Sequence, residues 1–212
     1  MIALSSIFLT SFVIAFSGAM MPGPLLTVTI SESARQGGWV GPKIIAGHAV
    51  LEIVLIAGIL LGLAPFLQND TFFILIAIAG GGIMIWMSWG MFSSLPQLNI
   101  NSDTGTKKQG NIYLSGILMS LANPYWIIWW ATIGLGYILH SMKFGIIGII
   151  LFFIGHILGD LVWYSSISFA IGRGRNLFTN KIYKLLVGSC AAFLTLFAVW
   201  LIYTGGVKLV VG

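Results

Sequence analysis

The chain has 212 residues, of which 58% are hydrophobic, 13% aromatic and only 7% charged, and its formal net charge is +5. A soluble domain carries about 25% charged residues, so this chain could not cover a water-facing surface. The composition excludes a nucleic-acid binder, a cytosolic enzyme and a disordered segment, and it predicts a protein whose solvent is mostly lipid. Cys190 is the single cysteine, which excludes an internal disulfide.

Six long apolar stretches predict an all-α, polytopic integral membrane protein with six transmembrane helices, because one bilayer crossing needs about 20 apolar residues. The stretches lie near Ile2–Thr29, Ile44–Leu67, Phe72–Phe92, Ile112–Leu139, Phe144–Ile171 and Leu185–Val207. A polar linker over residues 96–111 follows the third stretch. We therefore expect a first three-helix repeat over residues 1–95, a cytoplasmic linker over 96–111 and a second repeat over 112–212.

Prolines interrupt the first and fourth stretches, at Pro22, Gly23 and Pro24 and at Asn123 and Pro124. A proline inside a helix removes one N–H and costs about 3 kcal/mol. In lipid, the freed backbone groups are tolerated where they are buried in protein or line a cavity. We therefore expect two broken helices beside a polar cavity, where the Asn123 amide could bind a substrate or cap the freed carbonyls. A simple kink filled by packing is the alternative.

Two acids, Glu52 and Asp160, lie inside apolar stretches, and each follows a histidine, His48 or His156, by four residues. A charge at the bilayer centre costs at least about 2.5–3.5 kcal/mol, so such residues normally face the bundle interior or a water-filled path. The spacing places each histidine on the same helix face as its acid. The acids could therefore exchange a proton or hold a substrate ammonium group, with the histidines tuning them. Hydrogen bonds between helices are the structural alternative.

Aromatic side chains directly follow the second proline break, namely Tyr125, Trp126, Trp129 and Trp130. They could gate a cavity or bind a cation by their ring faces, although packing of the bundle is the favoured explanation.

Two small-residue motifs permit close helix approach, Gly58-x-x-x-Gly62 and Gly155-x-x-x-Gly159. They predict tight packing and leave a homodimer open.

The two halves share one pattern, a proline break followed by Gly-His-x-x-x-acid on the next stretch. Three spans per half is an odd number, so the second half enters the membrane from the opposite side, as an inverted repeat.

The basic residues predict the orientation. Two basic residues, Lys143 and Lys208, belong to one side of the membrane. Eight belong to the other side, in the connectors after spans one, three and five: Arg35, Lys43, Lys107, Lys108, Arg173, Arg175, Lys181 and Lys184. The eight are expected in the cytoplasm and both termini outside.

Several segments resemble the lysine-exporter (LysE/RhtB-type) family of membrane transporters. The run Ser17–Pro24 is similar to its Pro-Gly-Pro signature, Leu121–Pro124 to its Asn-Pro signature, and Gly159–Trp163 to its Gly-Asp segment. The resemblance implies an inner-membrane exporter of amino acids and related small solutes that is driven by the proton gradient. Tyr125 stands where many relatives have lysine and Glu52 where an aspartate is expected, which leaves the substrate open.

The first hypothesis is therefore a secondary exporter of amino acids or related small solutes, with proton coupling, no cofactor and no catalytic residue. Its partners are a small-molecule substrate and the lipid bilayer of the cell (inner) membrane. The alternatives are a divalent metal-ion exporter, since two histidines and two carboxylates form a plausible ligand set, and an intramembrane enzyme, for which no catalytic spacing is present.

Overall fold

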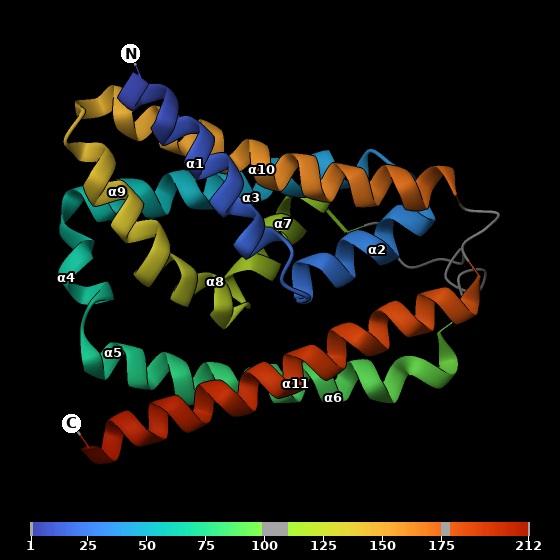
Figure 1. Cartoon of the computed structure of the whole chain (residues 1–212). Coiled ribbons are helices and arrows are strands. Elements are labelled where there is room, and N and C mark those ends of the chain that lie inside the picture. Colours follow the sequence, from blue (N-terminus) through green and yellow to red (C-terminus); the bar gives the residue numbers. More distant parts are fainter. Residues whose placement is uncertain (1, 99–109, 175–178, 212) are drawn as a thin grey trace.

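The computed structural model describes residues 2–98, 110–174 and 179–211. All regular elements in these ranges are helices, which confirms the predicted all-α class (Figure 1). Most of the predicted linker over 96–111 lies outside the described residues, and so do Asp103, Lys107, Lys108 and Arg175.

Within the described ranges, five helical rods are each long and apolar enough to cross a membrane. They are α1 (Ile2–Ala19), the rod Val40–Leu67, the rod Asp70–Gln97, α10 (Gly145–Arg173) and α11 (Asn180–Val211). A sixth span results if α7 (Ile112–Leu121) and the rod Pro124–Met142, which meet at a bend of 67°, count as one crossing. The chain is therefore a multi-pass membrane protein, and these rods overlap the six predicted stretches.

Three of the rods are not α-helical throughout: each contains a short π-helical stretch, and one also ends in a 3-10 turn. The elements are α3 (Val40–Gly58), η1 (Ile59–Leu63) and α4 (Ala64–Leu67) in the first rod; α5 (Asp70–Leu75), η2 (Ile76–Gly80), α6 (Gly81–Ser94) and η3 (Leu95–Gln97) in the second; and α8 (Pro124–Trp129), η5 (Trp130–Gly134) and α9 (Leu135–Met142) in the third. The motif Gly58-x-x-x-Gly62 was expected to pack against another helix. Gly62 instead has a φ of +109 and open space at the position of a Cβ, so it marks a kink in the rod.

Both predicted helix breaks are present. After α1 ends at Ala19, the backbone is extended at Gly23, and α2 (Pro24–Gln36) starts at a proline. After α7, Asn123 is also extended, and α8 starts at Pro124. Proline fits the first turn of a helix because its missing N–H would have no partner there. The two prolines thus begin new helices inside the bundle.

Glycines allow two helix pairs to lie unusually close, α1 along α10 and α3 along α7 (Figure 1). A Cβ on Gly155 would meet the Phe8 carbonyl and the Ser11 hydroxyl of α1, and one on Gly47 would meet the backbone of Tyr113 in α7. The motif that begins at Gly155 therefore packs within the chain, where a homodimer could not use it. A homodimer through another surface stays a prediction.

A second layer is formed by α11 and the rod Asp70–Gln97, in which α11 crosses α6 and α5 (Figure 1). At one end of this layer, Lys184 Nζ donates to the Pro96 carbonyl at 2.8 Å. At the other end, Lys208 Nζ pairs with Asp70 Oδ1 at 2.6 Å. Figure 1 shows that α1 begins and α11 ends on the same side of the bundle.

Candidate functional site

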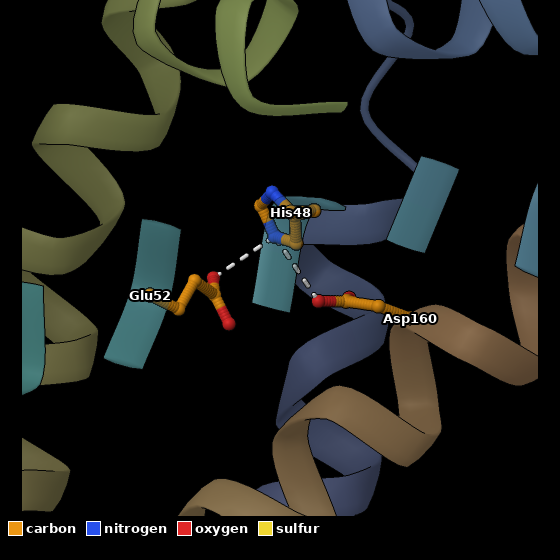
Figure 2. A group of neighbouring side chains, drawn as sticks. All are labelled: His48, Glu52 and Asp160. Carbon is orange, nitrogen blue, oxygen red and sulfur yellow. Dashed lines mark ion pairs between the residues drawn. The ribbon is translucent and has the colours of Figure 1, made fainter. Parts of the chain in front are cut away.

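The structure brings together the four ionisable residues that the sequence singled out, from α3 and α10. His48, Glu52, His156 and Asp160 are all buried, with 1–5% of each residue exposed. His48 Nε2 lies 2.9 Å from Glu52 Oε1 and 3.5 Å from Asp160 Oδ2. His156 Nε2 lies 3.2 Å from Glu52 Oε1 and 3.5 Å from Asp160 Oδ2. Figure 2 shows His48 between the two carboxylates. Each carboxylate thus contacts both histidines.

One oxygen of Glu52 carries most of these contacts. The indole Nε1 of Trp130 donates to Glu52 Oε1 at 3.0 Å, and that of Trp126 donates to the same atom at 3.3 Å. An indole N–H can only donate, so Oε1 is an acceptor, as an ionised carboxylate is. The second oxygen, Oε2, is buried with no hydrogen-bond partner in the described part of the chain.

A serine that the sequence analysis did not identify completes the surroundings of His48. Ser120 Oγ, on α7, lies 2.7 Å from His48 Nδ1 and 2.7 Å from the Gly116 carbonyl. The only local signal is a hydroxyl three residues before Asn123 in an apolar stretch. Its distance of 72 residues from His48 hid the contact, because the contact depends on how α7 packs on α3.

The ring of His156 has different neighbours. It stacks on Trp129 with ring centroids 4.7 Å apart and on Phe152 with centroids 5.9 Å apart. Its Nδ1 is buried and has no hydrogen-bond partner among the described residues. The two histidines therefore share the carboxylates but differ at Nδ1.

The cluster borders a cavity at the two helix breaks. Gly23 and Asn123 both line it, and a Cβ on Gly23 would lie 3.4 Å from the Asn123 amide nitrogen. Asn123 Oδ1 caps α8 by accepting from the Tyr125 N–H at 3.1 Å, whereas no side chain caps α2. The Tyr125 hydroxyl donates to the Ser17 carbonyl of α1 at 3.0 Å. The breaks thus bring both halves of the chain to one chamber.

The other predicted site residues lie around this chamber. Tyr125 and Trp126 line it, together with Trp129 and Trp130. Pro22, Pro24 and Pro124 are not among its lining residues, so they shape the breaks from outside.

The cavity measures about 40 Å³. A single water needs about 10–15 Å³ by this measure, so the chamber has room for a few waters and a larger solute requires it to open.

Part of the cluster has the dimensions of a metal site. One atom each of His48, Glu52 and Asp160 lies within 4.8 Å of the other two. However, Glu52 Oε1 already accepts from two indole N–H groups, which compete with an ion for its lone pairs. The donor set is therefore better matched to sharing protons than to binding an ion, and we assign no metal ligand.

The comparisons with known proteins cover nearly the whole chain. The sequence model of the family described as LysE type translocator matches residues 16–205. The chain is also similar to "Putative amino acid efflux protein YcgF" of Bacillus subtilis (strain 168), with 23% identity over 203 residues that cover 94% of this chain and 97% of that protein. No solved structure shows a significant match.

Proposed function

This chain belongs to the LysE type translocator family, and we propose that it exports amino acids or related small solutes by exchange for protons. Membership of a transporter family favours a carrier over an intramembrane enzyme. The relative described as an amino acid efflux protein supports the solute class. The proposal depends on one observation, the buried cluster of two histidines and two carboxylates beside two broken helices.

The cluster has the chemistry that proton exchange requires. Histidine changes charge near neutral pH, and burial penalises the charged form of a carboxyl group. When the chamber opens to water on one side, this penalty falls and the proton distribution can change. Glu52 and Asp160, with His48 and His156, are therefore the proposed proton-coupling groups or the groups that hold a substrate ammonium.

The broken helices supply a complementary charge. The first N–H groups of a helix have no partner inside it, and they carry the positive end of the helix dipole. At α2 no side chain caps these groups, and both Gly23 and Leu25 line the chamber. A substrate carboxylate could therefore bind at the start of α2 while its ammonium faces Glu52. Asn123, Tyr125 and Trp126 would form the opposite wall.

The arrangement of helices supports the proposed inverted repeat. In an inverted repeat, span one corresponds to span four and span two to span five. The contact of α1 (span one) with α10 (span five) then corresponds to the contact of α7 (span four) with α3 (span two). Both of these helix pairs are in close contact. Each contact includes the glycine directly before a cluster histidine, Gly47 or Gly155. We propose six spans in the cell membrane, with repeats over 1–95 and 112–212 and with both termini outside.

The test uses sealed inside-out membrane vesicles, an imposed pH step and a panel of radiolabelled amino acids. We expect Asp160→Asn to abolish proton-driven accumulation although the protein inserts normally, because the variant carboxamide cannot ionise. Asp70→Asn is the matched control, since this acid is exposed and pairs only with Lys208 among the described residues. Wild-type transport by Asp160→Asn, or no transport of any amino acid by the wild type, would overturn the proposal.

A divalent metal ion is the second candidate substrate, because the three cluster atoms lie within 4.8 Å of one another. The same vesicles tested with Mn²⁺, Zn²⁺ and Co²⁺ distinguish the two candidates. Metal accumulation that Asp160→Asn abolishes, without amino-acid transport, would replace the first candidate with the second.

A further inference from the structure

The two cluster histidines hold equivalent places in the sequence pattern but not in the hydrogen-bond network. Both turn Nε2 towards Glu52 and Asp160. With these carboxylates ionised, each Nε2 must carry a hydrogen, because a lone pair there would face negative charge. A second proton can therefore be gained only at Nδ1, so the partner of Nδ1 decides which ring can become doubly protonated.

Ser120 gives the Nδ1 atom of His48 a partner in both protonation states. When His48 is neutral, the Ser120 hydroxyl can donate its hydrogen to Nδ1 at 2.7 Å. When His48 is protonated, the hydroxyl can turn its hydrogen to the Gly116 carbonyl, also at 2.7 Å, and accept from Nδ1–H. A hydroxyl has one hydrogen and two lone pairs, so both arrangements are complete. Neither state leaves His48 Nδ1 unpaired.

His156 has no such neighbour. Its Nδ1 is buried and has no partner within the described ranges, so a second proton would create an unpaired buried donor. The stacked face of Trp129 would attract a cationic ring, yet it offers no hydrogen-bond acceptor in the ring plane. The buried serine of the adjacent helix α1 is Ser11, which lies against Gly155 and whose hydroxyl donates to the Phe8 carbonyl. A second proton therefore costs more at His156 than at His48, although both rings face the same carboxylates.

We propose that Ser120 is a positioning residue that allows His48, rather than His156, to take up and release the proton that drives export. The inference rests on the proton coupling proposed above. The titratable groups that face His48 are Glu52 on its own helix and Asp160 and His156 on α10. From α7 and α8 the facing groups are Ser120 and Trp126, which do not titrate in this range.

The proton itself is the probe in the test. Purified full-length protein with ¹⁵N-labelled histidine is titrated by NMR, in which the imidazole nitrogen shifts distinguish the tautomers from the doubly protonated ring. The variants His140→Gln and His48→Gln assign the three rings. We expect His48 to gain a second proton within the titration and His156 to stay neutral with hydrogen on Nε2.

Serine variants then test the hydroxyl. In Ser120→Ala the His48 midpoint should move to lower pH by roughly half to one unit, because the bond lost from the charged ring is stronger than that lost from the neutral ring. Ser120→Thr retains a hydroxyl and should restore the wild-type midpoint. Ser11→Ala, at an equally buried serine outside the cluster, should leave it unchanged.

Three results would overturn the inference: a titrating ring that belongs to His156, no doubly protonated ring in the wild type, or the same His48 midpoint with and without the hydroxyl. If Ser120→Ala fails to fold, the ring assignment in the wild type and in Ser120→Thr still decides the question. A wild-type protein that titrates at His48 but transports no amino acid under a pH step would instead overturn the proposed function.

Discussion

Replacing Glu52 separates its contribution to stability from its contribution to transport. In the wild type, the indole Nε1 atoms of Trp126 and Trp130 lie 3.3 and 3.0 Å from Glu52 Oε1. In Glu52→Gln, the amide oxygen can still accept from both. A hydrogen bond to a charged group is worth about 1.5–3 kcal/mol and one to a neutral group about 0.5–1.5 kcal/mol, so the two bonds together lose about 2 kcal/mol. For a chain of this size we expect Tm to fall by about 4–8 °C.

Glu52→Ala has a larger expected effect, because it leaves both indole N–H groups without an acceptor at about 1–3 kcal/mol each and also creates a cavity. We expect its Tm to fall by about 10 °C or more. Melting is followed by the fluorescence of the eight tryptophans, with Asp70→Asn as the control. Both Glu52 variants should lose proton-driven export. An alanine variant that melts with the wild type would refute the hydrogen-bond network, and a glutamine variant that transports normally would refute the coupling role.

Two further predictions concern packing and orientation. Gly155→Ala should destabilise the protein by about 1–3 kcal/mol, because its Cβ meets the backbone of α1. Gly136→Ala, in open space on a helix, should not lower Tm, because alanine is the better helix former. Equal Tm values for the two variants would contradict the packing described. In a Cys190→Ser background, a membrane-impermeant thiol reagent should label Lys43→Cys only from the cytoplasm and Asp70→Cys only from outside. Labelling of both from one side would refute the proposed orientation.

The amino-acid sequence by itself determined the class of the protein and the places where its helices break. The apolar stretches and the two proline breaks are local properties: a run of about 20 apolar residues fits the bilayer, and proline cannot continue a helix. The pairing of His48 with Glu52 and of His156 with Asp160 also followed from spacing within one helix. The family signatures are likewise local, so the sequence was sufficient to indicate the family.

Only the tertiary structure decided how these pieces meet. Glu52 and His156 are separated by 104 residues. Their contact depends on how α3 packs on α10, where a Cβ on Gly41 would meet the Tyr164 carbonyl. The approach of Ser120 to one histidine, and the convergence of two indoles on one oxygen, depend on the rotation of each helix about its axis. The hydrophobic pattern does not fix that rotation, because lipid and protein interior are similarly apolar and select the same side chains.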